Sequence, residues 1–503
     1  PDGRLLAADV DAHGLLLLSR EGTRLRVKRR LTISPYPVEI AVARDGRRAF
    51  VASLWSRRVS VVDVPADESD AFRVAATLDL PLAPHKLLWL EDRGTLIVGD
   101  NFGGRLAVVD AAADPPQLKT VRKFFAENIR GLAVDPKSGL LAVSHTMLNE
   151  FAHTIRNDVH WGVLMSNDLR WLQLAHVIDP AADFYTQGHM HPLGEPGMGG
   201  SEPAELAFFA DGTVVVPLAG VDKVAIGREG DFAMHRLDVG RCPTTAALSD
   251  KHRRAFVANL FDDSLSVIDI EEKNVAATIA LGPMRPLTDA EQGEKLFRDG
   301  RLSHDGWMTC NTCHAQGHTA GGLNDNFSDK SFGAPKRVLS LLGVKDTAPY
   351  AWNGSSASLA EQIKRSSAMT MQGRELSEQE IGRMVAYLQT LEPPPSVDAL
   401  RGGQDQKSVA RGKTLFGELR CVKCHAPPLY TSADLYDVGI HDKQGNTHFN
   451  PPSLRGVGQR GPYFHDAGAA SLDDVFVTHG HQLDGRVLSD DELRDLLNFL
   501  RSL

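Results

Sequence analysis

The stretch CNTCH, residues 310–314, decides how the second half of this chain is interpreted. A counterpart, CVKCH, occupies residues 421–425, and the segments that follow the two motifs also match. LSLLGVKDTAPYAWNGSSASLAEQI matches PSLRGVGQRGPYFHDAGAASLDDVF, and LSEQEIGRMVAYLQTL matches LSDDELRDLLNFLRSL. The chain therefore contains two homologous segments, each with one C-x-x-C-H motif.

Beyond Pro283, the apolar residues follow the period of helices, about 3.6 residues. Three capping boxes, each a Ser or Thr followed by a Glu three positions later, predict helix starts. They are Thr288 with Glu291, Ser377 with Glu380, and Ser489 with Glu492. We therefore expect two α-helical domains, residues 283–395 and 396–503, joined near the run EPPPS.

The final histidine distinguishes C-x-x-C-H from a plain C-x-x-C pair. The two thiols can each add to one vinyl group of a haem, and the histidine then ligates the iron. A zinc ribbon would bring its cysteine pairs closer in the sequence, and a redox-active pair needs neither the histidine nor the duplication. We predict two covalent c-type haems, one on Cys310 and Cys313 with His314 as proximal ligand, and one on Cys421 and Cys424 with His425.

The first 282 residues have a different pattern, in which strand-length apolar runs alternate with turns. Phrases such as RRAFVASLWSRRVSVVDV and RRAFVANLFDDSLSVIDI return at a period of roughly 40 to 47 residues, which is typical of four-stranded propeller blades. We count six units, of which the first lacks its opening strand, and the overlong unit after Ile129 has room for a seventh. The phrases resemble YVTN-type repeats, so residues 1–282 are expected to form a β-propeller of six to seven blades.

Composition excludes some partners. The net charge of -9 and the lack of Lys/Arg runs argue against nucleic acid. No apolar run approaches the ~18 residues that a spanning helix needs, so no membrane span is expected. From the turn-like start at Pro1 we expect the chain to be a mature or trimmed fragment.

Residues 284–503 resemble the bacterial di-haem cytochrome c peroxidase family, which includes MauG-type enzymes that oxidise a protein partner. The phrases FNPPSLRGVGQRGPYFHDAGAASLDDV and DLLNFLRSL carry the resemblance. It implies that both helical domains are of cytochrome c type. It also implies that the first haem reacts with hydrogen peroxide and that the second stores and passes electrons. Trp352 matches the tryptophan between the haems, and a small redox protein or other electron donor is implied. Haem attachment in bacteria also implies a periplasmic or exported location.

The sixth ligand of each iron decides its chemistry. The resemblance places the ligand of the second haem at His479 in THGHQ, with His481 as the rival. Moving His479 back by the offset between Pro462 and Pro349 reaches Ser366, a poor iron ligand, so the first haem is expected to have an open face. Met369 and Met371 lie nearby in the sequence and are the alternative ligands.

Family members place a Gln and a Glu over the first haem, where peroxide cleavage needs a proton carrier. Gln362 matches the Gln, but Gln372 stands at the Glu position and cannot act as an acid or base. Glu375 is the alternative. Relatives often hold a calcium ion between the haems, but the Asn that helps to bind it aligns with Arg337, which does not favour calcium here.

Other residues have two interpretations each. The fifth cysteine, Cys242, is expected to be a buried thiol. Histidines 145, 153, 160, 189 and 191 would form a metal or substrate site, or would simply be loop and strand histidines, which we favour. His318 is expected to hydrogen-bond near the first haem. Tyr350, Tyr463 and Trp307 would relay electrons or pack against the porphyrin.

Two functions follow. In the first, the protein is an oxidoreductase that uses peroxide at the first haem, with electrons arriving through the second haem and Trp352. In the second, it is an electron-transfer or binding module with two six-coordinate irons, whose propeller docks a redox partner.

Overall fold

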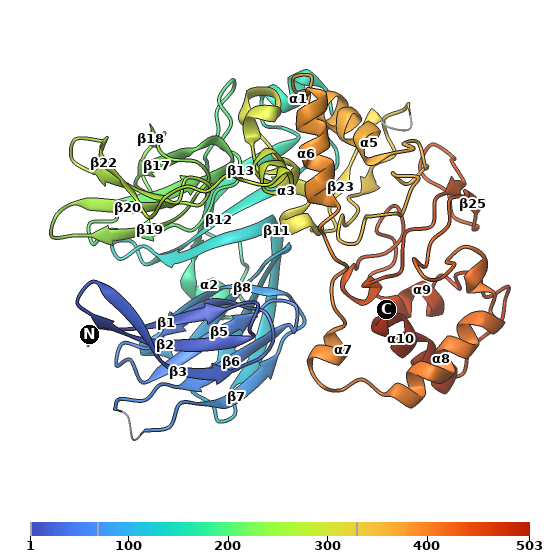
Figure 1. The fold of residues 1–503 in the computed structure, drawn as a ribbon, viewed down its shortest axis with the longest axis horizontal. Helices are drawn as coiled ribbons and strands as arrows, with labels where there is room; N and C mark the ends of the chain where they lie inside the picture. The colour runs from blue at the N-terminus through green and yellow to red at the C-terminus, as the bar shows by residue number, and fades with distance from the viewer. Residues whose placement is uncertain (1–2, 68–69, 328–329) are drawn as a thin grey trace. The chain divides into compact units, whose positions relative to one another are not determined.

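The computed structural model describes residues 3–67, 70–327 and 330–503 (Figure 1). Contacts divide the chain into two compact units. The first comprises Pro1–His145, Leu169–His191 and Phe208–Thr213, and the second comprises Thr146–Asp168, Pro192–Ala207 and Val214–Leu503. None of the helices in the described part of the chain has the length and apolar composition that crossing a membrane requires.

Antiparallel sheets make up the first part of the chain. A three-stranded sheet contains β1 (Arg4–Asp9), β2 (Gly14–Glu21) and β3 (Arg24–Thr32). A four-stranded sheet contains β4 (Pro37–Val42), β5 (Arg48–Ser53), β6 (Arg58–Asp63) and β7 (Arg73–Asp79). A seven-stranded sheet contains β8 (Pro84–Leu90), β9 (Thr95–Asp100), β10 (Gly103–Asp110), β11 (Gln117–Val134), β12 (Leu140–Leu148), β13 (Met165–Gln173) and β14 (His189–Pro192).

Two further sheets follow. One contains β15 (Ala207–Phe208), β16 (Val214–Leu218), β17 (Lys223–Gly227) and β18 (His235–Asp238). The other contains β19 (Pro243–Ser249), β20 (Arg254–Asn259), β21 (Ser264–Asp269) and β22 (Asn274–Ala280). Short helices α1 (Arg156–His160) and α2 (Leu174–Ile178) flank β13.

Adjacent sheets of the first unit share an apolar core. Phe50 on β5 and Val61 on β6 pack with Leu96 on β9 and Ala107 on β10, and all four are buried. Strands with one apolar face cannot bury that face alone, so the repeated sheets must pack against one another.

The multidomain organisation, β-rich and then helical, is confirmed. The first sheet has three strands, in line with the missing strand of the first predicted unit. The third and fourth predicted units form one seven-stranded sheet, because β11 is 18 residues long and lies between β10 and β12. A propeller of six to seven blades stays a prediction.

The helical part repeats one arrangement. Its helices are α3 (Asp289–Phe297), α4 (Cys310–Cys313), α5 (Leu359–Arg365), α6 (Glu378–Leu388), α7 (Val397–Leu400), α8 (Gln406–Glu418), α9 (Leu472–Val477) and α10 (Asp490–Ser502). Four two-residue strands form two small ribbons, β23 (Leu323–Asn324) with β24 (Lys336–Arg337), and β25 (Tyr436–Asp437) with β26 (His448–Phe449).

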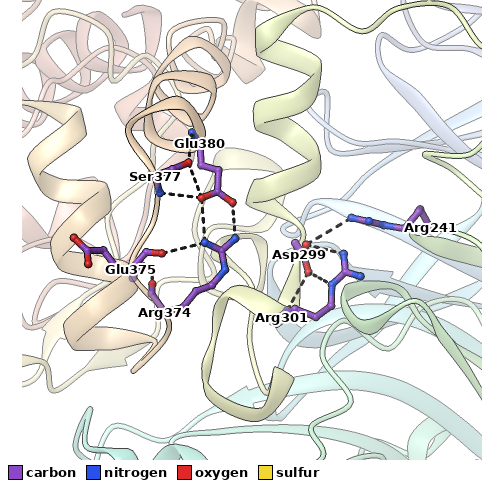
Figure 2. Close-up of polar contacts among 8 residues, drawn as sticks. Arg241, Asp299, Arg301, Arg374, Glu375, Ser377 and Glu380 are labelled. Atoms are coloured by element: carbon purple, nitrogen blue, oxygen red, sulfur yellow. Dashed lines mark hydrogen bonds and ion pairs between the residues drawn. The ribbon is translucent and has the colours of Figure 1, made fainter.

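All three predicted capping boxes are present, at the starts of α3, α6 and α10. Figure 2 shows the box of α6, in which Ser377 and Glu380 exchange hydrogen bonds. Arg374 adds two contacts to the Glu380 carboxylate and donates to the carbonyl oxygen of Glu375. The hydrogen bond from Arg374 is the main cause that lowers the pKa of Glu380 to about 2.

Each helical domain contains a pair of helices that cross through a glycine. A Cβ added to Gly293 on α3 would lie 2.0 Å from the carbonyl oxygen of Arg383 on α6. A Cβ added to Gly412 on α8 would lie 1.9 Å from the carbonyl oxygen of Asp495 on α10. The same close approach in both pairs supports the duplication seen in the sequence.

An ion pair and a hydrogen bond join the sheet β19–β22 to the first helical domain. Asp299, just after α3, accepts two hydrogen bonds from the Arg301 guanidinium at 2.8 Å (Figure 2). Arg241, just before β19, lies 3.6 Å from the same carboxylate. Lys295 donates to the carbonyl oxygen of Phe261 at 2.8 Å. These contacts fix the segment that leads into CNTCH.

Candidate haem sites

A cavity of about 280 Å³ lies beside the first C-x-x-C-H motif. Cys310, Cys313 and His314 form part of its wall, and residues of the second helical domain, including Pro451 and Arg460, close it. Much of the wall is apolar, with contributions from Phe297, Leu302, Leu341, Leu359, Ile363, Met384 and Leu388. An apolar cavity with a few convergent polar groups is what a cofactor of porphyrin type needs.

His314 is arranged as an iron ligand. Its Nδ1 lies 2.8 Å from the carbonyl oxygen of Leu339, so Nδ1 carries the proton and Nε2 keeps its lone pair. Burial lowers the pKa of His314 to about 4, which keeps the imidazole neutral at pH 7. A neutral, oriented imidazole is the form that binds a metal.

The thiols do not have the character of redox-active cysteines. Burial raises the pKa of Cys310 to about 12 and that of Cys421 to about 11. Redox-active cysteines depend on stabilised thiolates, which these surroundings disfavour. The residues therefore fit thioether attachment of a haem better than a redox-active pair.

The second motif repeats the arrangement of the first. Cys421 begins a short 3-10 helix, Cys421–Lys423, and His425 places its Nδ1 3.2 Å from the carbonyl oxygen of Tyr430. Burial lowers the pKa of His425 to about 4. Apolar residues of α8 and α10 pack beside this motif, among them Leu415, Phe416, Leu496 and Phe499.

Gln362 and Ser366 line the first cavity, and the amide of Gln362 donates to the Ser366 hydroxyl at 3.1 Å. The π-helical turn Ser366–Thr370, which continues α5, presents Met369 to the same cavity. Met371 follows it and also forms part of the wall. Ser366 and both alternative methionine ligands are therefore brought together.

Gln372 points elsewhere. Its amide nitrogen donates to the carbonyl oxygens of Thr154 at 2.7 Å and Met369 at 2.8 Å. It is absent from the described residues that line the cavity, and so is Glu375, which is exposed. No Asp or Glu is among the described lining residues. The described part of the cavity wall therefore offers amides, hydroxyls and cations, but no carboxylate.

The two histidines of THGHQ differ in their surroundings. His479 is exposed, and its Nε2 lies 3.1 Å from the carbonyl oxygen of Gly468. Burial lowers the pKa of His481, and His481 is close enough to His425 to affect the pKa of that group. Both imidazoles contact the ring of Phe464.

Trp352 is held between the two helical domains. Its indole nitrogen donates to the carbonyl oxygen of Arg337 at 2.7 Å, and its own carbonyl oxygen accepts the backbone N–H of Asn450 at 2.7 Å. The indole also lines the cavity. The Arg337 guanidinium lies 5.5 Å from the ring centroid, which is within the range of a cation–π contact.

Arg337 and Arg460 are buried cations in the cavity wall. Arg337 donates to the carbonyl oxygens of Phe464 and Arg460, and Arg460 donates to those of Ser453 and Leu342. Burial lowers their pKa values to about 10 and about 9, so both stay protonated at pH 7. A buried charge needs a counter-charge. The carboxylates of a haem would supply that counter-charge. Sequence reasoning did not identify either arginine as a residue that could hold them.

Comparison with known families identifies the helical part. Residues 288–393 match the di-haem cytochrome c peroxidase family, and residues 409–503 match the cytochrome c family. The chain contains a di-haem cytochrome c peroxidase domain and a cytochrome c domain.

Three relatives are similar to between 42% and 50% of this chain. Cytochrome c551 peroxidase of Nitrosomonas europaea is 24% identical over 307 residues, which are 50% of this chain and 92% of the relative. Methylamine utilization protein MauG of Methylorubrum extorquens is 27% identical, over 42% of this chain and 76% of the relative. Hydrazine synthase subunit gamma of Kuenenia stuttgartiensis is 22% identical, over 42% and 76%.

Further residues lie at the junction of the peroxidase domain with the cytochrome c domain. His318 bridges the two, with Nδ1 2.9 Å from the Ser340 hydroxyl and Nε2 3.0 Å from the carbonyl oxygen of Gln459. The Tyr463 hydroxyl donates to the carbonyl oxygen of Val457 at 2.9 Å. Tyr350 lines the cavity of the peroxidase domain.

The remaining predicted residues lie outside the peroxidase cavity. Cys242 is buried, and burial raises its pKa to about 12. His145 lies 3.3 Å from the Arg170 side chain, and His189 stacks on Trp171. His191 is buried, and His153 stacks on Phe332. His160 lies beside two residues of the peroxidase domain and is considered below.

Proposed function

We propose that the protein is a di-haem c-type oxidoreductase that reduces hydrogen peroxide, or uses it to oxidise a partner, in the cavity beside His314. The observation that carries this proposal is that one apolar cavity combines an attachment motif, a neutral imidazole and two buried cations. Two covalently bound haems, one on each C-x-x-C-H motif, would supply the electron-transfer and oxidation chemistry. The names of the relatives, cytochrome c551 peroxidase and MauG, support the assignment.

The chain's own residues position the oxidant. The Gln362 amide, which reaches the Ser366 hydroxyl, is the polar group that would hold a peroxide oxygen by hydrogen bonding. Because no carboxylate is among the described lining residues, the proton that moves between the peroxide oxygens must travel through water or hydroxyl groups. We therefore expect slower peroxide cleavage than in a cavity with a distal Glu.

Trp352 provides the path for electrons between the two helical domains. It is buried, lines the cavity and is hydrogen-bonded to both domains. The proposed boundaries are 1–282 for the propeller, 283–395 for the first cytochrome domain and 396–503 for the second. A small redox protein would deliver electrons to the second haem, and a periplasmic or exported location agrees with covalent haem attachment.

We further propose that the second iron takes its sixth ligand from THGHQ. His479 matches the family position, whereas burial and closeness to His425 support His481. Separate alanine variants decide between them. Removal of the ligand converts the low-spin electron paramagnetic resonance (EPR) signal of the second haem to a high-spin signal, and removal of the other histidine leaves it unchanged.

Peroxide titration of the full-length holoprotein tests the main proposal. The protein is produced in cells that attach haem covalently, and its mass is first measured by mass spectrometry. The expected mass is that of the chain plus two haems. Peroxide is then added to the oxidised, half-reduced and reduced protein, and absorption and EPR spectra are recorded. The proposed enzyme function is supported if the first haem is high-spin or readily opened and reacts with peroxide in one of these redox states.

The lack of a carboxylate among the described lining residues favours a second candidate, an electron-transfer or binding module. In that case Met369 or Met371 would be the sixth ligand of the first iron, so that both irons are six-coordinate. The β-rich part would then dock a redox partner. Two low-spin haems that stay inert to peroxide in every redox state would establish this function and exclude the first.

A further inference from the structure

Three possible metal ligands meet outside the haem cavity. His160 ends α1, and His304 and Asp305 belong to the short 3-10 helix His304–Gly306. One ligand atom from each residue lies within 4.8 Å of the other two. The Nδ1 atom of His160 is 2.6 Å from Oδ2 of Asp305, and Nε2 of His304 is 3.2 Å from the same oxygen.

The backbone of each ligand is fixed by a hydrogen bond. The carbonyl oxygen of His160 accepts the indole N–H of Trp307 at 3.0 Å. The N–H of His304 donates to the carbonyl oxygen of Met371 at 2.9 Å, and the carbonyl oxygen of Asp305 accepts the N–H of Gly199 at 2.6 Å. Such supporting contacts hold ligands in place before a metal arrives.

Trp307 leaves little freedom to the segment that carries His160. Its indole is buried, and a Cβ added to Gly162 or to Gly194 would lie 2.4 Å from its ring. Asp305 adopts a left-handed backbone with φ of 56°, which residues other than Gly adopt at a cost. This conformation directs the carboxylate toward both imidazoles.

The donor set matches one class of metal ion. Two imidazoles and one carboxylate bind divalent first-row transition metals, and zinc sites of this kind use three protein ligands and a water. The side chains of His160, Asp305 and His304 are 39%, 21% and 14% exposed. Solvent therefore reaches one side of the cluster, where an ion can enter and a water can complete its coordination.

We propose that His160, His304 and Asp305 bind one divalent transition-metal cation, with Zn²⁺ as the best fit. The ion joins α1 to the peroxidase domain. Because His304 is hydrogen-bonded to Met371, which lines the haem cavity, the ion also restrains that wall. The site is separate from the two haems and does not depend on their reaction.

Zinc binding to the tag-free, full-length holoprotein tests the site. The protein is treated with a chelator, desalted and dialysed against Zn²⁺, and bound zinc is measured by elemental mass spectrometry. One Zn²⁺ per chain is expected. His304→Ala and Asp305→Asn each weaken binding by at least about 10-fold. Asn tolerates the left-handed backbone at this position, so Asp305→Asn keeps the local fold.

His153→Ala is the matched control. His153 lies in the same part of the chain and pairs with Asp325 at 3.4 Å, but it does not belong to the three-residue cluster. Zinc binding by this variant should equal that of the unmodified protein, and the haem absorption spectrum verifies the folding of every variant. If His304→Ala does not fold, His160→Ala, which changes the more exposed ligand, takes its place.

Failure to bind one Zn²⁺ per chain overturns the proposal. So does binding that survives in the His160, His304 and Asp305 variants, or binding that the His153 control loses to the same extent. Co²⁺ provides a second readout, since bound cobalt, measured by elemental mass spectrometry, should be found only in proteins that bind Zn²⁺.

Discussion

At the scale of single residues, the two glutamines near the first haem site have different surroundings. Gln362 lines the cavity, whereas the Gln372 amide is bonded to two backbone carbonyl oxygens. The resemblance to the family assigned both glutamines to the cavity. A match in sequence gives the position of a residue along the chain but not the direction of its side chain. The direction of Gln372 depends on Thr154, which lies far away in the sequence.

Gln362→Leu is therefore expected to slow the reaction with peroxide by about 100-fold, since a positioned hydrogen-bond donor is lost. The measurement is the rate of the haem absorption change after rapid mixing. Gln372→Leu is the comparison. Because the Gln372 amide is bonded to two backbone carbonyl oxygens, a much smaller loss of rate is expected in this variant. Equal losses in the two variants would contradict the assignment of the positioning group to Gln362.

Because Cys242 is the one cysteine outside the two C-x-x-C-H motifs, thiol labelling can test whether the other four cysteines carry haem. It is buried and its pKa is raised to about 12 by burial, so the thiol stays protonated and unreactive at pH 8. We expect no maleimide labelling of the native holoprotein and one label per chain after denaturation. Two or more labels after denaturation would show that some of the other four cysteines do not carry haem.

At the scale of elements, the helix pairs α3 with α6 and α8 with α10 show what the sequence predicts well. Capping boxes and apolar periodicity are local signals, so the starts of α3, α6 and α10 were predictable. The seven-stranded sheet was not, because the repeat does not reveal that β11 is long enough to pair on both sides. The His160 cluster likewise depends on segments that only the fold brings together.

Gly412→Ala is expected to destabilise the protein by about 1–3 kcal/mol, because its Cβ would collide with the backbone of α10. Gly417→Ala, on the same helix, meets no atom within 4 Å. It should be neutral or stabilise by about 0.5–1 kcal/mol, since alanine favours helices. Thermal unfolding followed by circular dichroism measures both, and equal effects would contradict the close crossing.

At the scale of the whole molecule, the peroxidase and cytochrome c domains are joined through buried polar contacts. His318 reaches Gln459, Arg455 donates to the carbonyl oxygen of Gly343 at 2.7 Å, and Trp352 contacts both sides. An electron that travels between the domains crosses this junction.

Trp352→Phe should slow electron transfer between the haems by at least about 10-fold, because it removes the indole and its hydrogen bond to Arg337. Rapid mixing of half-reduced protein with peroxide, followed at the absorption of the second haem, measures the rate. Trp161→Phe changes an exposed tryptophan and is the control. An unchanged rate in Trp352→Phe, with normal haem spectra, would exclude this path.

The positive charge of the Arg337 guanidinium is a covalent part of the chain, unlike the charge of a bound metal ion. A bound ion exchanges with its surroundings, and its site empties when the ion becomes scarce. A cation carried on a side chain is made with the protein and is present in every copy. Arg337 places such a permanent charge in the cavity wall. Chelation of divalent cations would leave that charge in place.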